Sequence, residues 1–61
     1  MNNESIVTIK SALYFRVHQT SQAKEQHLKY GDTDDAAYDT AEIVRLRNAI
    51  KDFDELLRVK L

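Results

Sequence analysis

Apolar side chains recur at helical spacing over the last third of the chain. In the segment IVRLRNAIKDFDELL they stand three, four, three and four residues apart, at Ile43, Leu46, Ile50, Phe53 and Leu57. This spacing places all of them on one stripe of an α-helix. A helix with a single apolar stripe needs a neighbour to cover it, so we expect the rest of the chain to supply a second helix.

The residues that break helices favour a single turn near the midpoint. The chain has no proline and one glycine, Gly31, which is followed by Asp-Thr-Asp-Asp. Glycine accepts the left-handed conformation that commonly ends a helix, and Asp and Thr are good N-caps for the next one. We therefore predict one helical-hairpin domain over residues 1–61. Its helices would span about 4–30 and about 35–60, with a turn at 31–34. A second capping pair, Asp39 with Glu42, would start the second helix as late as Thr40.

An antiparallel arrangement brings the two most apolar stretches together. The first helix is richest in apolar residues near its start, and the second is richest near its end. In an antiparallel hairpin these two regions lie side by side, which agrees with the predicted fold. The predicted core is Ile6, Ile9, Leu13, Val17, Ile43, Leu46, Ile50, Phe53 and Leu57.

A short strand at Ser5–Lys10 is the alternative for the start of the chain. The sequence SIVTI is rich in β-branched residues, which favour strands. Such a strand would fit a ribbon-helix-helix DNA-binding transcriptional regulator, in which it pairs between two chains and enters the major groove. The length of the first helix and the net charge of -1 both oppose that alternative, and nucleic acid is not an expected partner.

The size of the chain favours self-association. A chain of 61 residues buries only about 60% of its unfolded surface. It has no cysteine, so neither disulfides nor thiolate metal sites can reinforce the fold. Apolar residues outside the stripes, among them Val7, Ala49 and Leu56, need a second layer. We expect an all-α hairpin that forms a homodimer with the architecture of a four-helix bundle. This plan resembles that of the plasmid copy-number control proteins, and because the resemblance is one of architecture, no RNA-binding residues carry over.

Nothing in the sequence has the pattern of a catalytic, cofactor or metal site. His18 and His27 are nine residues apart, so they point to opposite sides of one helix. Counted as a calcium loop from Asp32, the turn has the wrong residue at three of the five characteristic positions, which require four acidic residues and one glycine. No apolar run is long enough to cross a membrane, and the N-terminus lacks the pattern of a secretory signal. We expect a non-enzymatic cytoplasmic protein without cofactors.

The remaining expectation is function through protein-protein contact. Tyr14 and Phe15 are adjacent and cannot both face one stripe, and Arg45, Arg47 and Lys51 form a local basic excess. The residues predicted to bind a partner are Tyr14, Phe15, Arg45, Arg47 and Lys51. Very short helical chains without cysteine are often accessory regulators of phages or mobile elements, and that is the class of small regulatory protein we expect.

Overall fold

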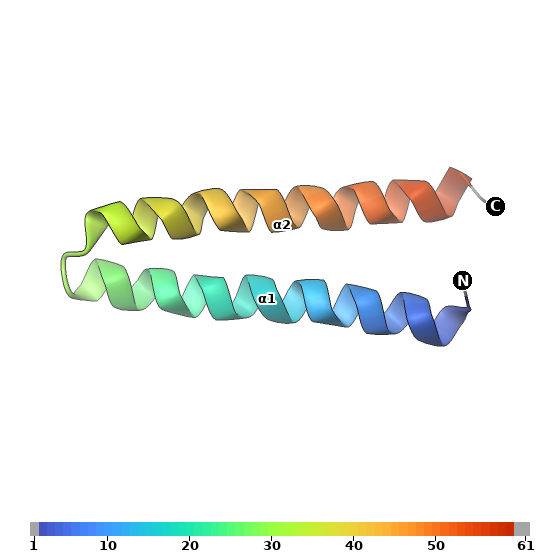
Figure 1. Ribbon diagram of the computed structural model, residues 1–61, viewed down its shortest axis with the longest axis horizontal. Coiled ribbons are helices and arrows are strands. Elements are labelled where there is room, and N and C mark those ends of the chain that lie inside the picture. Colours follow the sequence, from blue (N-terminus) through green and yellow to red (C-terminus); the bar gives the residue numbers. More distant parts are fainter. Residues whose placement is uncertain (1, 60–61) are drawn as a thin grey trace.

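Residues 2–59 form two helices that run side by side in opposite directions in the computed structural model (Figure 1). Helix α1 spans Asn3–Lys29 and helix α2 spans Thr33–Val59, each with 27 residues. A short turn joins them, and the start of α1 lies beside the end of α2 at the opposite end of the hairpin. The predicted all-α hairpin is confirmed. The predicted end of the second helix at residue 60 lies outside the described residues.

The start of α1 is capped by Asn2. The backbone N–H of Ser5 donates to Asn2 Oδ1 at 2.8 Å, which satisfies one of the free N–H groups of the first turn. Residues 5–10 are helical, so the strand considered for them is wrong, and the helix occupies the residues that would form the ribbon of a ribbon-helix-helix regulator. The cap and the helical spacing of Ile6 and Leu13 outweigh the weak strand preference of the β-branched residues.

The turn is built on Gly31, which has a φ of +79°. The N–H of Asp32 donates to the carbonyl of His27 at 2.7 Å, and the N–H of Gly31 donates to that of Leu28 at 3.2 Å. This pair of bonds is the Schellman arrangement that closes a helix C-terminus. Helix α2 follows at once from Thr33, so the later start suggested by the Asp39–Glu42 pair is wrong. Asp39 lies inside α2 instead, where its carboxylate contacts α1.

The interface between the helices follows a heptad pattern. Shielded side chains on α1 stand alternately four and three residues apart, and those on α2 three and four. On α1 they are Ile6, Lys10, Leu13, Val17, Thr20, Lys24 and His27. On α2 they are Ala36, Asp39, Ile43, Leu46, Ile50, Phe53 and Leu57. We call these two rows the seam.

The seam contains every predicted core residue except Ile9, which is 36% exposed and lies beside it. The shielded residues of α1 alternate four and three residues apart, and this alternation places Lys10, and not Ile9, between Ile6 and Leu13 in the seam. Its ammonium forms an ion pair with Asp54 at 2.8 Å, and its side chain is partly shielded from solvent. The prediction of Ile9 as a core residue is therefore wrong.

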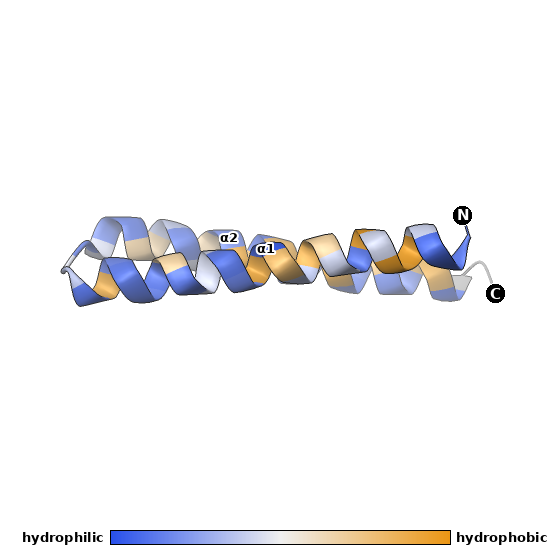
Figure 2. Cartoon of the chain, turned by 90° about the horizontal axis from the view of Figure 1, so that it is seen from below, coloured by the Kyte–Doolittle hydropathy of each residue, from blue (hydrophilic) through white to orange (hydrophobic). Residues whose placement is uncertain are grey.

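The hairpin is apolar at one end and polar at the other. In Figure 2 the hydrophobic colouring of α1 gathers in the half nearer the N-terminus. Towards the turn, the seam consists largely of polar side chains, including Thr20, Lys24, His27 and Asp39. The two ends of the hairpin therefore differ in chemistry.

The molecule is a single thin layer of 46 × 18 × 9 Å. Its radius of gyration is 14.3 Å, against roughly 10 Å for a compact domain of this length. Among residues 2–58, the buried apolar side chains are Ala36 and Ile50, and the rest of the predicted core is half-buried or more exposed. Within the same residues, neither helix has an apolar stretch of the kind that crosses a membrane.

Candidate protein-binding surfaces

The seam divides the surface between the helices into two faces. Residues that flank the seam on the same side of an antiparallel helix pair lie opposite one another. The Tyr14 face comprises Val7, Tyr14 and Ser21 of α1 with Thr40, Arg47 and Asp54 of α2. The Leu56 face comprises Ile9, Arg16 and Ala23 of α1 with Glu42, Ala49 and Leu56 of α2. Each face carries a shallow hollow, and the hollows differ in chemistry.

Charges interrupt the Tyr14 face. Its hollow, of about 240 Å³, is lined by Tyr14, Val17, Arg47 and Ile50. One turn before Tyr14 lies the ion pair of Lys10 with Asp54. The hydrogen bond to Asp54, followed by its charge, raises the pKa of Lys10 above its ordinary value, so this ammonium stays protonated at neutral pH. A partner covering this face would have to remove water from both ions and from Arg47.

The Leu56 face is apolar at the end away from the turn. At this end the flanking residues of both helices and the seam residues that border this face are apolar, whereas Lys10 borders the Tyr14 face. This apolar half comprises Ile6, Ile9, Ala12 and Leu13 of α1 with Leu46, Ala49, Phe53 and Leu56 of α2. Ile9 and Leu56 are both exposed, and Leu56 has 54% of its surface in contact with solvent. The first charged side chains met on this face are Arg16 and, at its edge, Asp52 and Arg45.

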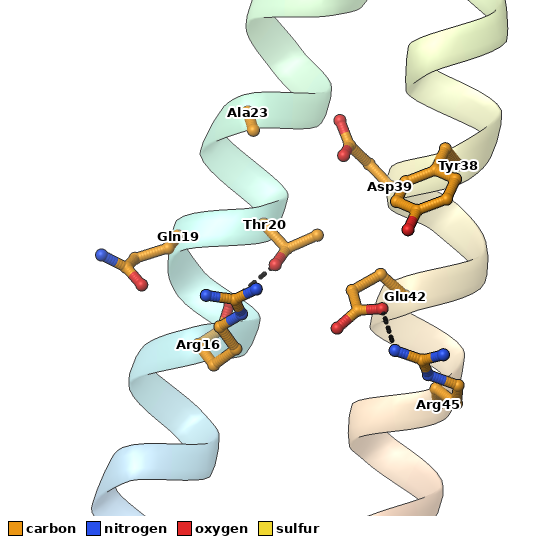
Figure 3. Close-up of a pocket in the computed structure, with 8 residues that line it drawn as sticks. All are labelled: Arg16, Gln19, Thr20, Ala23, Tyr38, Asp39, Glu42 and Arg45. Atoms are coloured by element: carbon orange, nitrogen blue, oxygen red, sulfur yellow. Dashed lines mark hydrogen bonds and ion pairs between the residues drawn. The ribbon is translucent and has the colours of Figure 1, made fainter.

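Nearer the turn, the Leu56 face is polar and hollowed (Figure 3). The hollow, of about 380 Å³, is lined by Arg16, Gln19, Thr20, Ala23, Tyr38, Asp39, Glu42 and Arg45. The carboxylates of Asp39 and Glu42 point from α2 towards α1, and Arg16 folds back beside Thr20. Glu42 accepts a hydrogen bond from Arg45 at 2.5 Å. Arg16 forms no ion pair with any residue between 2 and 59, so its charge is available to a partner.

The five predicted partner-binding residues do not form one surface. Tyr14 and Arg47 lie together around the hollow of the Tyr14 face. Phe15 follows Tyr14 by one residue and therefore lies on the side of α1 away from α2, with 61% of its surface exposed. Arg45 lies at the edge of the Leu56 face, held by Glu42, and Lys51 is exposed on the side of α2 that carries Arg47. Ala49 and Leu56 are predicted from the sequence to need a second layer, but their position opposite Ile9 on one face is not.

The titratable groups form one connection between the helices near the turn. His27 Nδ1 lies 2.6 Å from Asp39 Oδ2, and this hydrogen bond raises the pKa of His27 above its ordinary value. His18 is exposed on α1. Across residues 2–59, no three His, Asp or Glu side chains are grouped as a metal ion would require.

The faces of the hairpin carry the functional argument. No family model, curated protein or solved structure matches this chain in comparisons with known proteins. What the molecule does must therefore be argued from the chemistry of its two faces.

Proposed function

We propose that this protein is a non-enzymatic small regulatory protein that acts by protein-protein contact, and that its hairpin associates with a second copy into a four-helix bundle. The observation that carries the proposal is the thinness of the hairpin. Most side chains of its seam remain half-exposed, while Val7, Tyr14, Val44 and Leu56 add exposed apolar surface outside the seam. A second layer of two helices is the simplest structure that covers such a surface.

The surface area supports this proposal quantitatively. The chain exposes 4939 Å², whereas a compact folded chain of 7.1 kDa exposes roughly 4,100 Å². The excess of about 850 Å² is close to the ~800 Å² that each partner contributes to a protein-protein interface of standard size. A second copy covering one face would bring the exposed surface of each chain near the value expected for its mass.

The broader setting belongs to the same proposal. A small, cysteine-free helical chain suits a cytoplasmic accessory regulator of a phage or mobile element, because folding without disulfides fits a reducing compartment. A regulator of this kind would work by presenting a helical surface to another protein once its own apolar layer is covered.

Sedimentation equilibrium over a wide dilution series, with circular dichroism on the same samples, tests the proposal. The expected result is a mass twice the 7.1 kDa of one chain, with helicity that falls as the dimer dissociates. Loss of helicity on dilution would mean that folding and association are one event. A mass of one chain with full helicity at every concentration would contradict the proposal.

A further inference from the structure

We propose that the second copy docks on the Leu56 face, with the two hairpins parallel so that their turns lie side by side. This inference rests on the proposed self-association and specifies its interface. The occupant is a second copy because the excess surface of the chain matches the area that one partner contributes to a standard dimer interface. In addition, the apolar half of this face can pack on the same half of a second copy, and the polar half carries both signs of charge.

The choice of face follows from the charges. Docking on the Tyr14 face would cover the ion pair of Lys10 with Asp54 and the guanidinium of Arg47. Removing water from these ions costs free energy that an apolar contact does not regain. The charged side chains of the Leu56 face, Arg16, Asp39, Glu42 and Arg45, gather around its hollow, where both signs of charge are present, and Asp52 lies at its edge. Its apolar half offers an uncharged contact, and the small side chains of Ala12 and Ala49 allow helices of the second copy to approach closely.

The choice of direction follows from the polarity gradient. A twofold contact uses the same surface on both copies. With the hairpins parallel, each apolar half meets the other apolar half, and the polar hollows meet near the turns. There Arg16 of one copy can pair with an acidic side chain of the other, since each copy presents both signs of charge around its hollow.

The opposite direction is disfavoured in either of its two forms. Full overlap of antiparallel hairpins would place the apolar half of one copy over the polar hollow of the other, with Phe53 near Asp39. Overlap limited to the apolar halves would avoid this contact of apolar with charged side chains. It would cover only part of the face, and so would leave much of the excess of about 850 Å² exposed.

Two matched substitutions test the face. Leu56 and Val44 are aliphatic residues of α2 with 54% and 53% exposure, and Val44 lies three residues before Arg47, on the side of the Tyr14 face. Leu56→Glu should raise the dimer dissociation constant about tenfold or more, because it would bury a carboxylate in the interface. Val44→Glu should change it within about twofold. The reverse order of effects would overturn the inference while leaving self-association intact, whereas a monomeric parent protein would overturn the proposed function itself.

Spin labels on the otherwise unaltered chain keep the inference testable if Leu56→Glu fails to fold. The chain has no cysteine, so Ser5→Cys or Ser11→Cys introduces one labelling site per copy. Parallel hairpins should place the two Ser5→Cys labels well within the 46 Å length of the hairpin, and full antiparallel overlap should separate them by most of it. Ser5 lies on the side of the Leu56 face and Ser11 on the side of the Tyr14 face, so the distance between labels should be shorter at residue 5. A shorter distance at residue 11, or a long distance at residue 5, would overturn the inference.

Discussion

His27 and Asp39 join the two helices next to the turn, with His27 Nδ1 2.6 Å from Asp39 Oδ2. The hydrogen bond to Asp39 raises the pKa of His27, and the charges of Asp39, Asp35 and Asp32 act in the same direction, whereas partial burial opposes them. His27 therefore binds a proton more tightly in the folded chain than in the unfolded one. Its contribution to stability is fully present below the ordinary histidine pKa of 6.5 and is lost as the pH rises through the raised value.

This contact predicts a pH dependence of folding. The free energy of unfolding should fall as the pH rises from about 6 to about 8, and His27→Gln should flatten this part of the profile. His18→Gln is the control, because His18 is exposed and should leave the dependence unchanged. Urea unfolding followed by circular dichroism at a series of pH values measures the effect. Equal slopes for His27→Gln and the parent protein would show that the pair does not stabilise the hairpin.

Gly31→Ala should destabilise the hairpin by about 1–2 kcal/mol, because residue 31 has a left-handed backbone conformation. No atom lies within 4 Å of a Cβ built at this position, so the expected loss comes from the backbone and not from a clash. Gly31→Asn should reduce stability less than Gly31→Ala, since asparagine tolerates the left-handed conformation better than alanine does. Urea unfolding of both variants measures the difference. A Gly31→Ala protein as stable as its parent would mean that the turn changes shape at little energetic cost.

The sequence predicts the parts of the fold that depend on local chemistry. Gly31 predicts the turn because glycine is the residue type that best suits a left-handed backbone conformation. The apolar spacing of residues 43–57 predicts the seam of α2. The second half of α1 gave no such pattern, since Thr20 and His27 occupy seam positions there. The sequence predicts Ile9 and not Lys10 in the core, because hydrophobicity alone cannot show that Asp54 of the other helix lies within reach of Lys10.

The candidate surfaces were harder to predict for the same reason. Which residues share a face depends on how the two helices align. That alignment brings Tyr14 to Arg47 and places Arg45 on the other side of the hairpin. The His27–Asp39 contact was not predicted either, because the two residues are adjacent only across the turn.

Thr20→Val should stabilise the hairpin by about 0.5–1 kcal/mol, because it replaces a buried hydroxyl with a methyl group in the seam. Thr20 is 8% exposed, and its hydroxyl donates to the carbonyl of Arg16 at 2.9 Å. In an α-helix that carbonyl already accepts the backbone N–H of residue 20, so the extra bond is dispensable. Thr8→Val is the matched control. The Thr8 hydroxyl makes the same bond to Glu4 at 2.9 Å, but Thr8 is exposed and should change stability by only a few tenths of a kcal/mol. Thermal unfolding of both variants tests this, and a loss of stability at residue 20 would show that the hydroxyl is needed there.

The loss of stability caused by Phe53→Ala should differ between a four-helix bundle and an isolated hairpin. Phe53 is half-buried in the hairpin and borders the apolar half of the Leu56 face, so a second copy docked there would bury it completely. In a bundle the substitution should cost about 3–5 kcal/mol, the usual loss for truncating a fully buried phenylalanine. In an isolated hairpin the cost should be smaller, because part of the ring already contacts water.

Unfolding of the Phe53→Ala and parent proteins at high and low protein concentration distinguishes the two cases. If a second copy covers Phe53, the difference in stability should be largest where the parent is dimeric and should shrink as the parent dissociates. Phe15→Ala is the control, because Phe15 faces away from α2 and from both hollows and should change stability by about 0.5 kcal/mol or less at either concentration. A Phe53→Ala effect within about 0.5 kcal/mol would mean that neither the seam nor a second layer buries this ring. A large effect independent of concentration would mean that the hairpin buries it without a second copy.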